Sequence, residues 1–250
     1  MRILFPSNWI SISDKMATLQ QLQNELLTLG SPEKAAFLSR FFKTGKGQYG
    51  EGDVFIGITM PEIRGLAKKY NHLPIKDWEL LLHSPFHEYR MTALIGLMKR
   101  FQQSKKDEAT QQTIFNLYLN NLHYINNWDL VDVTCRDIVG AFLLNRDRSI
   151  LYDLAQSSHL WSQRVSIVST WYLIVRYQYT DTIRISELLL SHKHDLIHKA
   201  VGWMLREMGK RDELTLIEFL DTHVKQMPRT ALRYAIERFP ESTRKYYLSL

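Results

Sequence analysis

A tryptophan and an aspartate four positions apart, Trp128 and Asp132, are the residues in this sequence best suited to chemistry. A helix that starts at Asn127 would place both side chains on one face. An indole attracts cations and stacks on bases or sugars. A carboxylate beside it can stabilise developing positive charge or orient a water molecule. Asn127 itself suits a helix N-cap and Asp129 the first helical turn, so neither needs a further role.

Asp132 also occupies a position that carries a base elsewhere in the chain. Basic residues followed by apolar and small ones recur at Arg90, Arg164, Lys199 and Arg233. The last three lie 35 and 34 residues apart, and Asp132 precedes Arg164 by 32 residues. If these segments are equivalent helices of a repeat, their bases line one continuous strip. Such a strip is an electrostatic footprint for a phosphate backbone, with Asp132 as an acid within it.

Simpler roles remain open for these charged side chains. Each base could sit on a solvated surface beside a local carboxylate, for which Glu88, Glu207 and Glu237 are near enough in sequence. Asp132 could pair with Arg136, one helical turn further on. Both alternatives would leave the row of bases without a common function.

The tryptophans divide into two groups. Trp203 follows Lys199 by four residues, as Trp128 precedes Asp132 by four, so each indole shares a helix face with a residue of the strip. Packing in the core is the alternative for both indoles. Three other tryptophans have apolar neighbours and are assigned to the core: Trp78, Trp161 and Trp171.

Helices must position these side chains, because nearly every segment from Met16 onward shows helical periodicity. A short extended piece is expected only at Val54 to Ile58. Past residue 75 the helices come in pairs, a short one before a longer one, which is typical of HEAT-like repeats. The expected helices span residues 16–29, 32–43, 61–70, 75–83, 86–102, 107–121, 127–144, 147–157, 160–178, 180–191, 194–209, 212–223, 228–238 and 241–248.

Composition sets the broad class of protein. The chain has 250 residues, of which 45% are hydrophobic and 23% charged, as in an ordinary soluble protein. Cys135 is the only cysteine, which excludes an internal disulfide and favours an intracellular, cytoplasmic setting. No stretch is apolar for long enough to predict a membrane span. The net charge of +6 is compatible with a polyanionic partner.

Two weaker motifs are interpreted without a ligand. The glycine-rich stretch Thr44 to Pro61 lacks the GK[ST] ending of a phosphate-binding loop, so a connector is the favoured interpretation. His194 and His198 have the spacing of a zinc helix, but Asp195 stands where that motif needs Glu and no third ligand is identifiable. We therefore expect no metal at this site.

Four stretches together resemble the AlkD-type DNA alkylation repair family, which consists of DNA glycosylases built from HEAT-like repeats. The resemblance runs from about residue 33 to the C-terminus. Its landmarks are the stretches at residues 47–55, 127–132, 161–164 and 199–207. Membership implies an all-α, right-handed superhelical solenoid of HEAT-like repeats whose basic concave face holds duplex DNA. Residues 16–250 would form this single domain, after an N-terminal extension at residues 1–15.

The resemblance also implies roles for individual residues. Trp128, Asp132, Arg164 and Trp203 match the residues that form the family's cleft around a damaged nucleotide. Asp132 would act on the sugar and the attacking water, both tryptophans would hold the nucleoside's backbone, and Arg164 would hold phosphate or position Asp132. Tyr49 matches approximately a tyrosine of the family's early loop. Arg90, Lys199 and Arg233 remain the expected DNA-binding bases.

The expected reaction is hydrolysis of the N-glycosidic bond of an N3- or N7-alkylated purine in double-stranded DNA. Alkylation gives the base a positive charge, so the leaving group needs no general acid and one carboxylate is enough. The expected protein is a monomeric, monofunctional hydrolase without metal or cofactor. Two alternatives are a catalytically silent family member that binds damaged DNA and a HEAT-type scaffold that binds an acidic protein.

Overall fold

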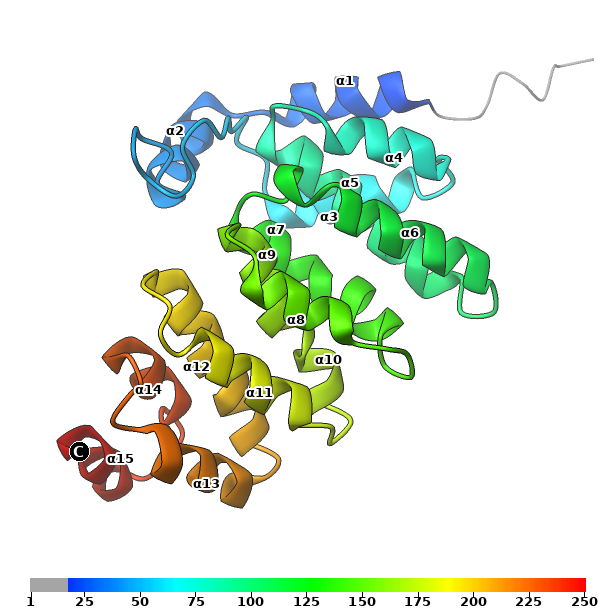
Figure 1. The fold of residues 1–250 in the computed structure, drawn as a ribbon. Coiled ribbons are helices and arrows are strands. Elements are labelled where there is room, and N and C mark those ends of the chain that lie inside the picture. The colour runs from blue at the N-terminus through cyan, green and yellow to red at the C-terminus, as the bar shows by residue number, and fades with distance from the viewer. Residues whose placement is uncertain (1–17) are drawn as a thin grey trace, which may run out of the picture.

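The computed structural model describes residues 18–250, and all regular elements among these residues are helical (Figure 1). The predicted all-α fold is thereby confirmed. Val54 forms an isolated bridge with Phe86, which is where the sequence predicts a short extended piece. Within the described range no helix has the length and apolarity that a membrane span requires. The predicted extension at residues 1–15 lies outside the described residues.

The helices of the first half follow the predicted periodicity to within three residues at each end. Polar caps start several of them; Thr18 and Gln21, for example, form a reciprocal capping box at the first helix. The elements are α1 (Leu19–Leu29), α2 (Pro32–Phe41), α3 (Met60–Lys69), α4 (Ile75–Leu82), α5 (His87–Gln103), α6 (Glu108–Asn120) and the short 3₁₀ helix η2 (Leu122–Tyr124).

The second half contains two departures from the expected boundaries. The predicted helix 160–178 is broken at Thr170, whose hydroxyl donates to the carbonyl of Ile167 at 2.7 Å and so competes with the helix ladder. The predicted helix 127–144 passes through a π-helical turn. The elements are α7 (Trp128–Cys135), η3 (Arg136–Gly140), α8 (Ser149–Gln156), α9 (Leu160–Ser169), α10 (Trp171–Ile174), α11 (Thr180–Leu189), α12 (Asp195–Gly209), α13 (Glu213–His223), α14 (Arg229–Ala235) and α15 (Glu241–Ser249).

The π-turn brings the chain after α7 against α9. A side chain on Gly140 would place its Cβ 2.2 Å from the carbonyl oxygen of Ser169, so this approach requires glycine. Cys135, which precedes the turn, is fully buried. The two helices that carry Asp132 and Arg164 therefore pack in direct contact.

Successive helices pack in pairs, and the pairs follow one another in chain order along the molecule (Figure 1). Helix α4 packs on α5, α8 on α9 and α11 on α12. Helices α5, α7, α9, α12 and α14 also contact one another in this order. One continuous apolar cluster runs through all these contacts. This arrangement is the one expected of stacked helical repeats, and it places α7, α9 and α12 side by side.

Candidate functional site

A cleft of about 710 Å³ lies where α7, α9 and α12 meet the loop that follows α2. The helices contribute side chains from one surface, and the loop contributes a wall of aromatic and basic groups. Six residues predicted from the sequence line this cleft: Tyr49, Trp128, Asp132, Arg164, Lys199 and Trp203. The fold thus gathers side chains that are spread over more than half of the chain.

Asp132 and Arg164 form a two-point ion pair at the floor of the cleft. The Nε and Nη2 atoms of Arg164 donate to Oδ1 and Oδ2 of Asp132 at 2.8 and 2.7 Å. The remaining guanidinium nitrogen of Arg164, Nη1, donates to the carbonyl of Leu196 at 2.5 Å. Parallel bonds of this kind fix the plane of a carboxylate. Arg164 therefore positions Asp132, and each of its three guanidinium nitrogens donates one hydrogen bond to a protein acceptor.

Burial decides the protonation behaviour of Asp132. The side chain is 15% exposed, and burial raises its pKa above the ordinary value, while the Arg164 guanidinium opposes that shift. The predicted alternative partner, Arg136, instead stacks over the ring of Trp171, with its Cζ 4.6 Å from the ring centroid. Asp132 therefore has its ion pair on the neighbouring repeat and not on its own helix.

Aromatic rings form one wall of the cleft. Trp128 stacks on Phe42 with ring centroids 5.1 Å apart and meets Phe41 edge-on at 6.0 Å. Tyr49 packs edge-on against Trp161 at 6.2 Å, and the ammonium of Lys43 lies 5.9 Å from the tyrosine ring. The indoles of Trp128 and Trp203 are half-buried and line the cleft. Of the tryptophans assigned to the core, Trp78 and Trp161 are buried, whereas Trp171 is half-buried.

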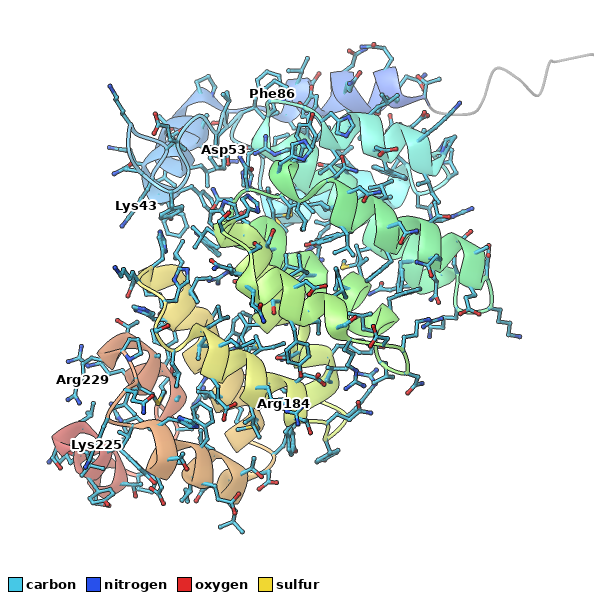
Figure 2. All side chains as sticks on the ribbon, viewed as in Figure 1. Lys43, Asp53, Phe86, Arg184, Lys225 and Arg229 are labelled. Carbon is cyan, nitrogen blue, oxygen red and sulfur yellow. The ribbon has the colours of Figure 1, made fainter. Side chains whose placement is uncertain are left out.

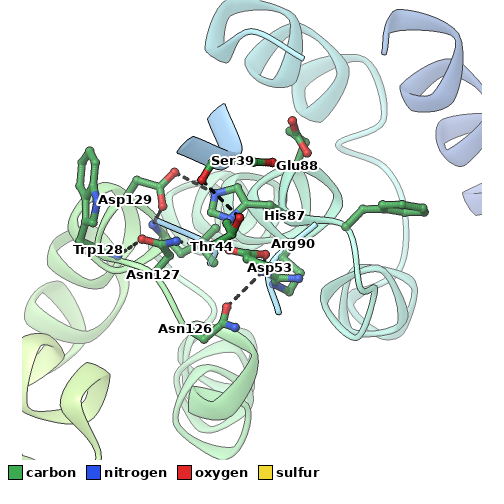
Figure 3. A network of polar contacts seen from close by, with 12 residues as sticks. Ser39, Thr44, Asp53, His87, Glu88, Arg90, Asn126, Asn127, Trp128 and Asp129 are labelled. Carbon is green, nitrogen blue, oxygen red and sulfur yellow. Dashed lines mark hydrogen bonds and ion pairs between the residues drawn. The ribbon is translucent and has the colours of Figure 1, made fainter. Parts of the chain in front are cut away.

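A polar network joins the start of α7, where Trp128 lies, to neighbouring segments (Figure 3). The two ring nitrogens of His87 contact Asp53 at 2.7 Å and Asp129 at 2.9 Å. Asp53 also accepts from Arg90 and, at 3.3 Å, from the amide of Asn127. Asn127, the N-cap residue of α7, in turn accepts from the backbone N–H of Trp128 at 2.9 Å. The network ties the glycine-rich loop to the start of α7.

His87 carries a proton at the centre of this network. Burial alone would lower the pKa of His87, but the carboxylates of Asp129 and Asp53 raise it to about 9. Burial would likewise raise the pKa of Asp53, but His87 and Arg90 lower it. Buried Asp53, His87 and Arg90 thus contact one another and half-buried Asp129, which pairs charges that would be costly alone.

Residues 22–239 match the model of the family described as DNA alkylation repair enzyme. The chain belongs to this family. A solved structure described as a predicted DNA alkylation repair enzyme from Enterococcus faecalis matches with a TM-score of 0.67 at 20% identity, over 85% of this chain and 97% of that one. At that identity the likeness shows a shared fold. No curated protein matches the chain.

Arg90, which the sequence predicts to bind DNA, does not line the cleft. Arg90 is 4% exposed, and its guanidinium contacts Asp53 and the carbonyls of Ser84 and Pro85. It therefore does not line the cleft, and the predicted strip of exposed bases does not extend to it. The repeat register places Arg90 correctly on its helix, but the glycine-rich loop covers that position with Asp53.

The other bases of the predicted strip differ in their surroundings. Lys199 lines the cleft and pairs with Asp195 at 2.8 Å. Arg233 is exposed on α14 but is not among the cleft-lining residues. The local partners predicted for the strip serve other groups: Glu88 accepts from the backbone of Ile56, Gly57 and Ile58, Glu207 pairs with Lys210, and Glu237 pairs with Arg206.

Sequence reasoning missed two cations at the mouth of the cleft. Lys43 follows α2 and Lys193 precedes α12; both are exposed and line the cleft. Neither has a carboxylate within ion-pair distance among residues 18–250. Lys43 comes from the same loop as the buried Asp53 (Figure 2). Both lysines lie in loops, so a search for equivalent positions within helices does not find them. The basic character of these loops was the feature of the sequence that could have indicated them.

The two weaker motifs have structural roles in this family member. Gly47, Gly52 and Gly57 have φ values of 75°, 82° and 86°, and the tight loop that they permit delivers Asp53 to its partners. His194 caps α12 by accepting from the N–H of Leu196 at 3.2 Å, while His198 contacts the carbonyl of His192. Residues 18–250 contain no cluster of three side chains arranged as metal ligands.

Proposed function

We propose that this protein is a monofunctional DNA glycosylase that hydrolyses the N-glycosidic bond of positively charged N3- or N7-alkylpurines in duplex DNA. The observation that carries the proposal is Asp132, fixed by Arg164 in a cleft between two indoles. Family membership supports a role in DNA alkylation repair. The proposal adds the reaction and places it inside the cell, where a single copy of the chain acts on DNA.

The proposed reaction needs one carboxylate. The bond from C1′ to the purine nitrogen breaks with its electron pair going to the base, which is thereby neutralised and leaves without protonation. Positive charge then develops on the sugar, as in glycoside hydrolysis. The Asp132 carboxylate stabilises this charge and orients water, whose oxygen bonds to C1′ and whose proton passes to Asp132 and on to solvent.

Arg164 and the two indoles prepare the site for this step. Because Arg164 holds both carboxylate oxygens, Asp132 need not reorient as charge develops on the sugar. Trp128 and Trp203 present aromatic faces that favour a cationic nucleoside. Lys43 and Lys193, whose ammonium groups have no ion-pair partner among the described residues, are suited to the phosphates on either side of it.

Replacement of the carboxylate tests the mechanism. We expect Asp132→Asn to lower the release of 7-methylguanine or 3-methyladenine from methylated duplex DNA by about a hundredfold or more, because charge stabilisation is lost. Asp195→Asn is the matched control, since Asp195 lines the same cleft but is exposed and pairs with Lys199. Base release by chromatography measures both. Unchanged release by Asp132→Asn would refute the proposed mechanism.

A second candidate is a family member that binds damaged DNA without cleaving it. One observation favours it: both oxygens of Asp132 are engaged by Arg164, and burial raises the pKa of the carboxyl. Purified wild-type protein separates the candidates. Tight binding to alkylated DNA with no base released over long incubation would support the silent form and exclude the glycosylase.

A further inference from the structure

Helix α2 differs from the helices around it because none of its residues is buried. It lies at the edge of the molecule (Figure 1), and its last residue, Phe41, lines the cleft. Two phenylalanines four residues apart share one of its faces, and they are 60% (Phe37) and 53% (Phe41) exposed. Their rings lie nearly parallel, with centroids 6.2 Å apart and an interplanar angle of 14°. An exposed aromatic pair of this kind marks a surface on which something apolar is placed.

The pair is continuous with the cleft. Phe41 lines the cleft and meets Trp128 edge-on at 6.0 Å. Phe37, Phe41 and Trp128 therefore form an aromatic row that leads from the exposed face of α2 to the Asp132 side of the cleft. A ligand held against Trp128 would extend past Phe41.

The charge on α2 and in the loop after it indicates what that ligand is, because its bases outnumber Glu33, the acidic residue of α2. Arg40, Lys43 and Lys46 are all exposed, and none has a carboxylate within ion-pair distance in the described part of the chain. An apolar protein segment would gain nothing from three unpaired cations. A nucleic acid satisfies both features, because its bases offer flat apolar faces and its phosphates offer negative charge.

We infer that the Phe37–Phe41 face of α2 is a base-stacking surface, which takes up a nucleobase that has lost its stacking partner beside a lesion in duplex DNA. This inference rests on the proposed function only in that both require DNA as the ligand. Aromatic side chains stack on any base, and apolar side chains that enter a base step are known to wedge duplexes open. Such a surface would favour distorted duplexes over intact ones.

Binding to two duplexes tests the inference. One is intact, and the other carries a tetrahydrofuran abasic site opposite an unpaired base. We expect Phe41→Ala to weaken binding to the abasic duplex by about tenfold, because the stacking energy between the base and the phenylalanine ring is lost. Binding to the intact duplex should stay within about twofold of wild type. Fluorescence anisotropy at fixed salt measures both affinities.

Tyr246→Ala is the matched control. Tyr246 is an aromatic residue with similar exposure, 57%, on α15, and it does not line the cleft. This variant should bind both duplexes as wild type does. Phe37→Ala should repeat the selective loss of Phe41→Ala to a smaller degree, because Phe37 lies further from Trp128. Circular dichroism confirms that each variant is folded.

Three outcomes would overturn the inference: wild-type protein that binds neither duplex, Phe41→Ala with wild-type affinity for both, or equal losses on both. A glycosylase assay on the same preparations keeps this test separate from the proposed function. If wild type releases no base but Phe41→Ala still loses abasic binding selectively, the stacking surface stands and the proposed reaction fails. If wild type releases bases while Phe41→Ala binds normally, the reverse holds.

Discussion

The Asp132 carboxylate is held in the cleft by an arginine of a neighbouring helix, Arg164. The spacing of Trp128 and Asp132 predicted their shared face. The repeat register singled out Arg164, the spacing from Lys199 singled out Trp203, and the family resemblance assigned all four residues to one cleft. All four line one cleft. The sequence left two partners open for Asp132, namely Arg136 on the same helix and Arg164 on the neighbouring one. The sequence allows an ion pair between Asp132 and either arginine. Only the packing of α7 against α9 decides that the partner is Arg164.

His87 leads to a prediction about pH and stability. Its folded-state pKa of about 9 lies above the ordinary value of 6.5. The folded protein therefore binds this proton more tightly than the unfolded chain does. The stabilisation is complete below about pH 6.5 and is lost as the pH rises through about 9. We expect the free energy of unfolding to fall by up to about 3 kcal/mol across this window.

Denaturation in urea at pH 6, 7.5 and 9 measures that change. The groups that face His87 are Asp53 and Asp129, with Arg90 on the far side of Asp53. His87→Gln removes the titrating proton, so the variant should be less stable at pH 6 and its stability should change little up to pH 9. A wild-type protein whose stability is flat over this range would show that His87 is not protonated in the folded state.

Close packing of α12 on α14 gives a prediction at the scale of helices. A Cβ on Gly202 would lie 2.4 Å from the carbonyl oxygen of Ala231 and 2.5 Å from Cβ of Tyr234. Gly202→Ala must therefore push the two helices apart. We expect it to destabilise the protein by about 1–3 kcal/mol, as overpacking typically does. Because Trp203 is the next residue, its position in the cleft should change as well.

Gly65 provides the matched control for this substitution. It lies within α3, and a Cβ added there meets no atom within 4 Å. Gly65→Ala should stabilise the protein by roughly 0.5–1 kcal/mol, since alanine loses less backbone entropy in a helix. Thermal unfolding of both variants gives the comparison. Equal stability changes of the same sign would contradict the packing argument.

Most helices were predictable because their apolar residues recur with helical spacing, and the two breaks were not. The break at Thr170 coincides with a side-chain hydrogen bond, and the π-turn at residues 136–140 ends at Gly140, which packs against the backbone of Ser169 in α9. The burial of Arg90 was not predictable from the register either. A register argument treats each repeat alike, whereas the loop that carries Asp53 covers only the repeat of α5. Contacts between distant segments decide the surroundings of Arg90 and Gly140, whereas the bond of Thr170 is local and reaches only Ile167.

Polar ties link the repeats at nearly constant separations. Arg90 contacts Asn126 across 36 residues, Arg164 contacts Asp132 and Leu196 across 32 each, and Arg206 contacts Glu237 across 31. The last three bases of the predicted strip, Arg164, Lys199 and Arg233, lie 35 and 34 residues apart in the sequence. The two periods agree closely, which supports an array of equivalent helix pairs. The period is visible in the sequence. That Arg90 and Arg164 would form hydrogen bonds between repeats is not.

Salt dependence tests the proposed DNA interface of the whole molecule. We expect the double variant Lys43→Gln and Lys193→Gln to bind duplex DNA more weakly. The slope of log affinity against log salt should become shallower by about 2, since each phosphate contact contributes about 0.9. Lys106→Gln is the control, because Lys106 is exposed in the turn between α5 and α6 and does not line the cleft. An unchanged slope in the double variant would exclude both lysines as phosphate contacts.

The hydrogen bonds between repeats also determine whether the protein or the DNA bends in the proposed complex. Asp132, Arg164 and Arg206 all line the cleft, and their bonds connect α7, α9, α12 and the end of α14 in series. If the array of helices opened on this side, every bond in the series would lengthen. The cleft side of the array therefore resists bending. In the proposed complex the duplex is then the more compliant body and must take up any mismatch in curvature. Recognition would favour sites where DNA bends at low cost, such as the weakened step beside a damaged base pair.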